Sequence, residues 1–132
     1  MTIERVVEVA LRWGDSDSFA HVNNVVFFRL LEEARARVIP NEGPGSTLLK
    51  NGLVVAEQQL KYTAPLHYRL EPISVGMSVD HLGGSSFRLA ARVFDAHTDV
   101  VFAEGFVSLV AYDFATAAPR KLTADERQWH SS

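Results

Sequence analysis

Two periods of apolar residues divide the chain into recognisable elements. Residues 5–13 alternate between an apolar and a charged face, which predicts a half-buried β-strand. Its inner face carries Val7, Val9, Leu11 and Trp13. Residues 14–24 are polar and rich in turn-forming residues, so we expect a loop there. After this loop apolar residues recur every three or four positions, and this period predicts a helix over residues 24–38.

The predicted helix has ordinary signals at both ends. Asn23 and Asn24 stand where an N-cap belongs, and Pro40 follows the last helical turn. The apolar stripe consists of Phe27, Leu30, Leu31, Ala34 and Val38. Val26 and Phe28 lie outside this stripe, so the helix is apolar over more than half of its circumference. We therefore expect it to be central and covered on several sides.

Four further strand patterns follow the helix, at residues 53–63, 73–81, 86–95 and 100–112. Gly83 and Gly84 predict a hairpin between the second and the third. The last pattern is apolar on both faces except at Glu104 and Ser108, so we place it in the centre of a sheet or at a subunit contact. One long helix and a run of antiparallel strands predict an α+β fold, in which a curved sheet of about five strands wraps the helix.

The composition indicates one folded domain. Of 132 residues, 47% are hydrophobic and 22% are charged, which is typical of globular proteins and excludes a disordered chain. We expect a single domain over residues 1–132, with a flexible connection at residues 41–52 and a partly frayed tail at residues 115–132. Because the chain has no cysteine, disulfides, Cys-ligated metal sites and a thiol nucleophile are excluded.

Charge and hydropathy exclude several classes of partner. The formal net charge is −3 and there is no broad basic face, so we expect no nucleic-acid partner. No apolar run reaches the roughly 18 residues of a membrane span, and the N-terminus lacks the layout of a signal peptide. The five histidines show no metal-ligand spacing, so no metal is expected. These features predict a cytoplasmic protein without a membrane partner.

The polar loop before the helix carries the candidate chemistry. It reads Asp15-Ser16-Asp17-Ser18-Phe19-Ala20-His21-Val22 and runs directly into the helix. A carboxylate here would lie beside the unpaired N–H groups of a helix start, which together with the helix dipole can hold an oxyanion. Asp17 can then serve as a base or a nucleophile toward a bound carbonyl. The alternative is that these residues only form turns and cap the helix, and we expect Asp15 to be such a solvated turn residue.

The loop and the segments after it carry a family signature. It consists of Arg12–Asn24, Phe27-Phe28, Glu32–Arg35, Tyr62–Leu66, the Gly83–Ser86 hairpin, Ala103–Gly105 and Val110–Asp113. These residues resemble the hotdog-fold acyl-CoA thioesterases, most closely the 4-hydroxybenzoyl-CoA thioesterase-like branch. The resemblance covers nearly the whole chain. It implies a hotdog fold and a homodimer whose two sheets join edge to edge, often paired into a homotetramer, with coenzyme A across a subunit boundary.

The resemblance also implies roles for residues of the loop and the helix start. Asp17 corresponds to the catalytic carboxylate of the family, and the backbone N–H groups of Asn24 and Val25 to the donors that hold the thioester carbonyl. His21 either orients Asp17 or a water, transfers a proton, or only packs beside the helix. Asn23 either bonds the loop backbone and so holds Asp17 in place, or takes a direct part in the site.

Binding of a coenzyme A carrier needs a few cationic or polar groups near the mouth of the site. The substrate-binding candidates are Lys61, His67, Arg69, Ser85, Ser86 and Arg88. Three departures from the family pattern bear on this: Ala20 replaces a frequent Gly, Tyr68–Glu71 replaces a Tyr-Gly-Asp turn, and Gly84 replaces a frequent Arg or Lys. The last change removes a phosphate ligand that many members have.

The sequence thus predicts a thioesterase that hydrolyses an acyl-CoA or an acyl group on a carrier protein to a free acid and a thiol. It needs no cofactor apart from the coenzyme A of the substrate. Whether Asp17 activates water or forms a transient anhydride stays open. The alternatives are a non-catalytic, acyl-ligand-binding hotdog protein and a hotdog dehydratase or hydratase. The latter would carry a His after an Asn-Pro pair, which this chain lacks.

Overall fold

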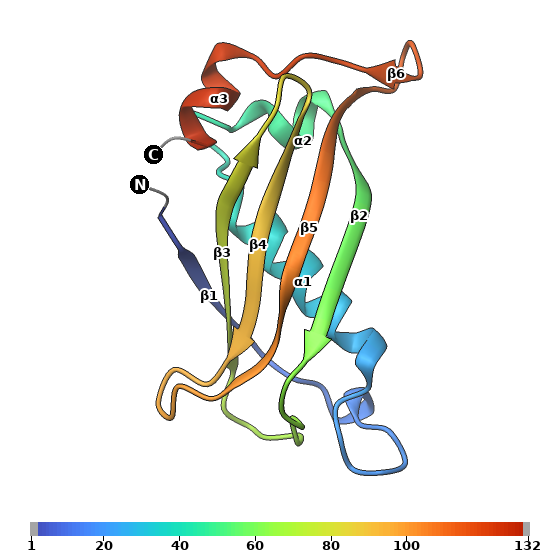
Figure 1. Cartoon of the computed structure of the whole chain (residues 1–132), viewed down its shortest axis with the longest axis vertical. Coiled ribbons are helices and arrows are strands. Elements are labelled where there is room, and N and C mark those ends of the chain that lie inside the picture. The colour runs from blue at the N-terminus through green and yellow to red at the C-terminus, as the bar shows by residue number, and fades with distance from the viewer. Residues whose placement is uncertain (1–2, 131–132) are drawn as a thin grey trace.

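A computed structural model describes residues 3–130, which form a curved antiparallel sheet around one long helix (Figure 1). The strands are β1 (Arg5–Val9), β2 (Leu53–Tyr62), β3 (Ile73–Leu82), β4 (Ser86–Phe94), β5 (Val101–Asp113) and β6 (Ala118–Pro119). The helices are the 3-10 helix η1 (Trp13–Asp15), α1 (Asn24–Val38), α2 (Thr47–Asn51) and α3 (Ala124–His130). The strand order is β1-β3-β4-β5-β2, and the short β6 pairs with β5. The predicted α+β architecture is confirmed.

Helix α1 spans the predicted residues, and its apolar stripe packs on the inner face of the sheet. Phe27, Leu30, Leu31 and Ala34 are at most 2% exposed. Burial of each large side chain of this kind contributes about 1.5–3 kcal/mol. The sheet contributes the buried residues Val75, Met77, Phe87, Leu89, Val107 and Leu109. Val26 and Phe28 are partly buried against the same core, as expected for a helix covered on several sides.

The first strand is shorter than the alternating pattern predicts. β1 ends at Val9, and the chain then turns through η1 into the polar loop. Val9 and Leu11 are buried as predicted. Trp13 is not on the inner face: it is 81% exposed and packs edge-on against Tyr68, with ring centroids 5.6 Å apart. The alternating pattern in the sequence extends beyond the strand, but the chain leaves the strand geometry after Val9 and η1 turns Trp13 outward.

The two strands at the far side of the sheet have different environments. β5 lies between β4 and β2, which confirms the central position predicted from its two apolar faces. β2 is an edge strand that pairs only with β5 among the described residues, and most of its side chains are exposed. Val55 is 42% and Tyr62 39% exposed. An unpaired edge of ten residues can pair with another strand.

The frayed tail expected from residue 115 is wrong for the residues described. β6 and α3 follow instead, and Trp129 and His130 are buried beside Phe87. The connection at residues 41–52 also contains an unpredicted helix, α2, which buries Leu48. Both segments lie together at one end of the sheet (Figure 1). Residues 131–132 of the predicted tail lie outside the described residues.

A buried ion pair fixes the C-terminal segment. Glu126 is 0% exposed and contacts both terminal nitrogens of Arg120, at 2.8 and 3.1 Å. The Thr123 N–H donates to the same carboxylate at 2.8 Å, as does the Thr47 hydroxyl at 3.1 Å. Burial alone would raise the pKa of Glu126, but these donors outweigh it and the pKa lies below its ordinary value.

Within residues 3–130 no helix combines the length and hydrophobicity of a membrane span.

Candidate functional site

A depression of about 280 Å³ lies where the start of α1 meets the end of β2. Its lining consists of His21, Val22, Asn24, Phe27, Tyr62, Thr63, Ala64, Pro65 and Leu66. The depression therefore joins the end of the polar loop, the first turn of the helix and the end of the edge strand. Asp17 is not among the lining residues, and it reaches the depression through its contacts with His21.

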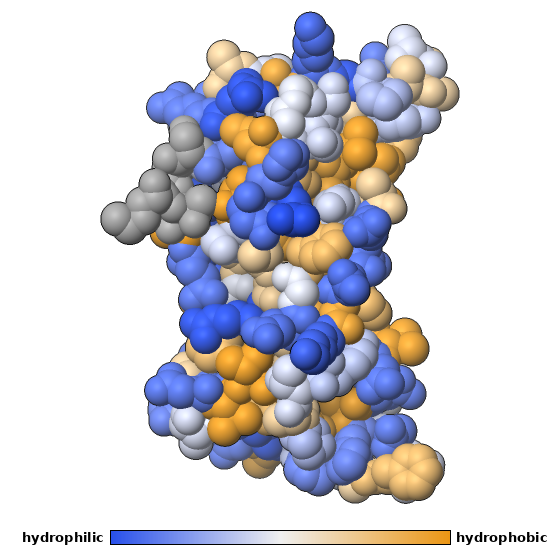
Figure 2. All heavy atoms as spheres, viewed as in Figure 1, coloured by the Kyte–Doolittle hydropathy of each residue, from blue (hydrophilic) through white to orange (hydrophobic). Residues whose placement is uncertain are grey.

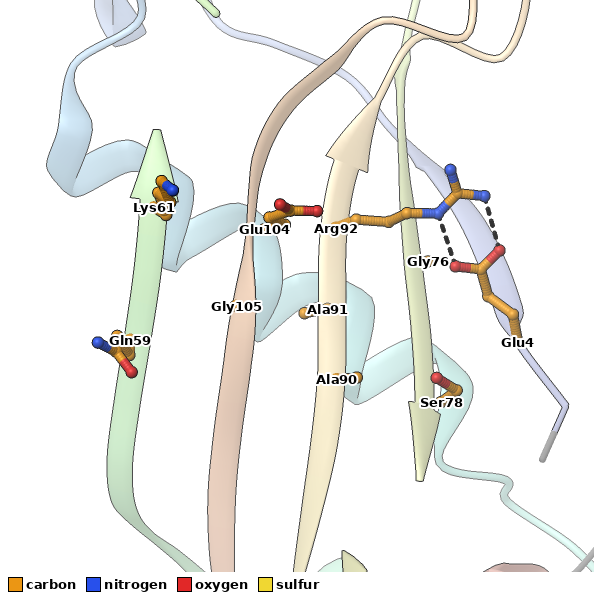
Figure 3. Close-up of a pocket in the computed structure, with 10 residues that line it drawn as sticks. All are labelled: Glu4, Gln59, Lys61, Gly76, Ser78, Ala90, Ala91, Arg92, Glu104 and Gly105. Carbon is orange, nitrogen blue, oxygen red and sulfur yellow. Dashed lines mark hydrogen bonds and ion pairs between the residues drawn. The ribbon is translucent and has the colours of Figure 1, made fainter. Parts of the chain in front are cut away.

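A second depression, of about 520 Å³, lies on the face of the sheet that points away from α1 (Figure 3). Its floor consists of the small residues Gly76, Ala90, Ala91 and Gly105. Glu4 and Arg92 pair across one side through two contacts of 2.7 and 2.8 Å. Hydrophilic and hydrophobic side chains alternate over this face (Figure 2). The lining of this larger depression includes no helix start and no residue of the polar loop, so we take the smaller depression as the candidate site.

Asp17 is held by the backbone of its own loop. Its Oδ1 accepts the N–H of Phe19 at 2.8 Å and of His21 at 3.3 Å. The Asp17 N–H donates to the His21 carbonyl at 2.7 Å, so the two residues are joined in both directions. The other oxygen, Oδ2, has no hydrogen-bond partner among residues 3–130. The loop therefore fixes the carboxylate and leaves one of its oxygens available.

Asp15 is not the solvated turn residue that the sequence suggested. It is 1% exposed, and its Oδ2 accepts hydrogen bonds from the Arg12 N–H and from Arg29 Nη2, each at 2.7 Å. Its carbonyl accepts the N–H of Asn23 at 2.9 Å. The reason is Arg29 on α1, which brings a cation to a carboxylate that would otherwise need water.

The start of α1 offers fewer free donors than the resemblance implied. The Asn23 side chain caps the helix by accepting the Val25 N–H at 3.0 Å. The Asn23 carbonyl accepts the Val26 N–H at 2.9 Å. Val25 thus already has a partner, whereas the Asn24 N–H has none within the described part of the chain. One backbone donor at the mouth of the depression remains for a ligand oxygen.

Two histidines lie beside the loop. His21 and His67 form an isolated β-bridge, and their rings meet edge to face with centroids 4.8 Å apart. His67 Nδ1 lies 3.2 Å from the carbonyl of Ala20, which has a positive φ of 63°. The substitution of Gly by Ala at position 20 therefore does not prevent the left-handed turn. Of the predicted substrate-binding residues, His67 is the one that the fold brings next to the loop.

Tyr62 is a residue of this region that sequence reasoning did not single out as functional. Its hydroxyl donates to the Asn24 carbonyl at 2.9 Å, and its ring packs edge-on against Phe27 at 5.2 Å. Partial burial raises the pKa of Tyr62, so the hydroxyl keeps its proton and remains a donor. Tyr62 thereby ties the end of the edge strand to the first residue of α1. The available signal was its place as the last apolar residue of an alternating strand, shortly before Pro65 ends the pattern.

The other predicted substrate-binding residues lie elsewhere in the protomer. Lys61 lines the outer depression, and Arg88 pairs with Asp80 at 2.8 Å. Arg69 binds Asp95 and the Pro72 carbonyl, and its hydrogen bond, with those of backbone N–H groups, lowers the pKa of Asp95 to about 2. Ser85 and Ser86 lie in the β3–β4 hairpin, at the opposite end of the sheet from the polar loop (Figure 1).

Comparisons with known proteins give a consistent family. A family model described as the thioesterase-like superfamily matches residues 11–129. Comparison with curated proteins gives no match. Among residues 3–130, no three His, Asp or Glu side chains gather closely enough to hold a metal ion.

Solved structures similar to the chain include several thioesterases. A presumed acyl-CoA thioesterase from Xanthomonas campestris is 35% identical, with a TM-score of 0.72, and the match covers 83% of this chain and 93% of that one. A thioesterase from Thermus thermophilus, in complex with coenzyme A and zinc, is 28% identical, with a TM-score of 0.81 and coverage of 96% and 97%. A presumed thioesterase from Pseudomonas aeruginosa is 26% identical, with a TM-score of 0.78 and coverage of 93% and 95%.

Proposed function

The chain belongs to the thioesterase-like superfamily, and from this premise we propose that it hydrolyses the thioester of an acyl-CoA to a free acid and coenzyme A. One observation carries the proposal: a carboxylate oxygen of Asp17 and the N–H of Asn24, both without partners in the described residues, flank one loop beside the 280 Å³ depression. The similar thioesterase in complex with coenzyme A supports coenzyme A as the carrier.

In the proposed reaction, Asn24 and Asp17 have different roles. The Asn24 N–H, at the positive end of α1, stabilises the oxyanion that forms when the carbonyl carbon is attacked. Asp17 either takes a proton from the attacking water or attacks the carbon itself to give a mixed anhydride that water then hydrolyses. In both routes the C–S bond breaks and the sulfur leaves as the thiolate, which takes up a proton. Both routes need the same ionised carboxylate.

We further propose that the active form is a homodimer joined at β2. Among the described residues no strand pairs with its outer edge, and Val55, which is 42% exposed, lies on this strand. Twofold antiparallel pairing of two β2 strands reverses one protomer relative to the other. The β3–β4 hairpin of one copy would then lie at the end where its partner carries the polar loop. In that arrangement Ser85 and Ser86 serve the site of the other protomer.

Release of free thiol from a panel of acyl-CoAs tests the function. The chain has no cysteine, so a thiol reagent reports only the product. Asp17→Asn keeps the acceptor for the Phe19 and His21 N–H groups but cannot take a proton or attack a carbon. We expect it to lower kcat by at least about a hundredfold with the fold retained. The control is Glu42→Gln, an exposed carboxylate beyond the far end of α1, which should leave kcat unchanged.

Each other outcome identifies a different error. Equal activity of Asp17→Asn and the parent would refute the carboxylate mechanism. Binding of acyl-CoA without thiol release would favour a non-catalytic ligand-binding protein. Hydration of an enoyl-CoA, followed by its absorbance, would favour the hydratase alternative. Activity only with acyl groups on a carrier protein would keep the chemistry and replace the carrier.

A further inference from the structure

We propose that Asp15 and Arg29 form a clamp that holds Asp17 and the start of α1 at their working separation, so that both are positioning residues for the reaction. The inference rests on the proposed function, because it assigns these residues a role in that hydrolysis. Neither residue lines the depression, and Asp15 was expected to be solvated. The clamp is defined as the Asp15 carboxylate, the Arg29 guanidinium and the hydrogen bond from the Asn23 N–H to the Asp15 carbonyl.

The contacts of Asp15 connect three segments. Its carboxylate, 1% exposed, binds the Arg12 N–H in front of the loop and Arg29 on α1, which is 14 residues away in the sequence. Its carbonyl binds Asn23, the residue that caps the same helix. Charge-assisted hydrogen bonds are short and directional, so this residue has little freedom relative to α1.

The clamp closes the base of the loop that carries Asp17. Above it the loop bonds to itself, through the bridge between Ser16 and Val22 and through the Asp17 N–H to the His21 carbonyl at 2.7 Å. The loop is thus a small closed unit attached to α1 at its base. Asp17 lies two residues after Asp15, and Asn24 lies one residue after Asn23. The position of the carboxylate relative to the oxyanion donor therefore depends on the clamp.

Stability alone does not account for a charge pair at this place. Arg29 is 30% exposed, and even for a fully buried ion pair, replacement by well-packed hydrophobic residues of similar volume often leaves the free energy of unfolding unchanged or raises it. A displacement of about 1 Å at a reacting group, however, can lower the rate by about a hundredfold. We therefore expect changes in the clamp to act on kcat much more than on KM.

Arg29→Lys is the sharpest test because it keeps the positive charge but replaces the guanidinium, whose Nη2 contacts Asp15, by an ammonium on a shorter side chain of different shape. We expect the variant to fold, to lose at least about tenfold in kcat and to keep KM within about threefold of the parent. The matched control is Arg37→Lys on the same helix, whose ion pair with Glu33 at 2.9 Å is exposed. This control should change neither kcat nor KM.

A double-mutant cycle separates positioning from a general structural effect. If Arg29 acts through Asp17, then Arg29→Lys should cost nothing further in kcat once Asp17→Asn is present. Equal losses in the two backgrounds would overturn the proposal. So would an unchanged kcat in Arg29→Lys, or a loss seen in KM alone.

Amide hydrogen exchange gives a readout that does not need activity. Arg29→Lys should accelerate exchange of the Phe19 and His21 amides, which bond to Asp17, and leave the last two turns of α1 unchanged. Unchanged exchange in the loop would overturn the clamp even if the parent is an active hydrolase. A parent that releases no thiol while the loop exchange still responds would instead refute the proposed function and retain the clamp.

Discussion

Removal of Arg120 should destabilise the protein in a way that depends on pH. Arg120→Met keeps much of the apolar stem but leaves Glu126, which is 0% exposed, with only the Thr123 N–H and the Thr47 hydroxyl as donors. A buried carboxylate without its cation is costly when ionised. The variant will therefore fold with Glu126 protonated, and the pKa of this carboxyl changes from below to above its ordinary value.

The magnitude follows from the cost of that proton. The ordinary pKa is 4.5, so protonation at pH 7 spans about 2.5 pH units, or about 3 kcal/mol. The hydrogen bond from Arg120 to the Gly52 carbonyl, at 3.2 Å, adds about 1 kcal/mol that does not depend on pH. We expect a loss of about 4 kcal/mol at pH 7, which lowers Tm by roughly 10–20 °C for a chain of this size.

Urea denaturation of parent and variant at several pH values measures the difference. In the parent the lowered pKa stabilises the fold above the ordinary value, and this contribution is lost as pH falls; in the variant the raised pKa has the opposite effect. The difference should thus shrink from about 4 kcal/mol at pH 7 to about 1 kcal/mol near pH 4.5. A difference that stays constant with pH would refute the reasoning. Lys121→Met, an exposed neighbour, should cost less than about 0.5 kcal/mol throughout.

Three further expectations concern other parts of the structure. Tyr62→Phe removes the hydrogen bond to the Asn24 carbonyl, so the free energy of unfolding from thermal denaturation should fall by less than about 1 kcal/mol. We expect kcat to fall several-fold, because the edge strand no longer holds the helix start. Val55→Lys places a charge on the unpaired edge of β2 and should shift the mass in light scattering toward a monomer; an unchanged dimer mass would exclude β2 as the contact. Burial lowers the pKa of His130, so the stability that neutral His130 provides is full above about pH 6.5 and is lost as pH falls below it. His130→Leu should remove this part of the pH slope in urea denaturation between pH 7.5 and 5.5, which lies above the range of the carboxylates.

The parts of the fold that the sequence predicted are those with a long hydrophobic period. Helix α1 and the strands after it were identifiable because fifteen helical residues and strands of nine to thirteen residues repeat their pattern several times. The C-terminal helix α3 has seven residues and buries Glu126, Trp129 and His130. Two of these three are polar, so no apolar stripe marks the helix. Glu126 pairs with Arg120, six residues earlier in the chain. Only the folded structure shows this contact, because no periodic pattern links the two residues.

The candidate site shows the same limit at finer scale. A sequence presents Asp15 and Asp17 as two similar carboxylates in a polar loop, and local chemistry gives no reason to bury either. The two carboxylates differ because Arg29 binds Asp15. The helical period in the sequence places Arg29 on α1, but it does not indicate which residue Arg29 will contact. Once the fold brings Arg29 to Asp15, the Asp15 carboxylate becomes part of the support, and Asp17 keeps one oxygen without a hydrogen-bond partner in residues 3–130. In the same way, the Val25 N–H donates to the Asn23 side chain, whereas the Asn24 N–H has no partner within the described residues. Which of two neighbouring groups can bind a ligand is therefore decided by which of them already has a hydrogen-bond partner in the fold.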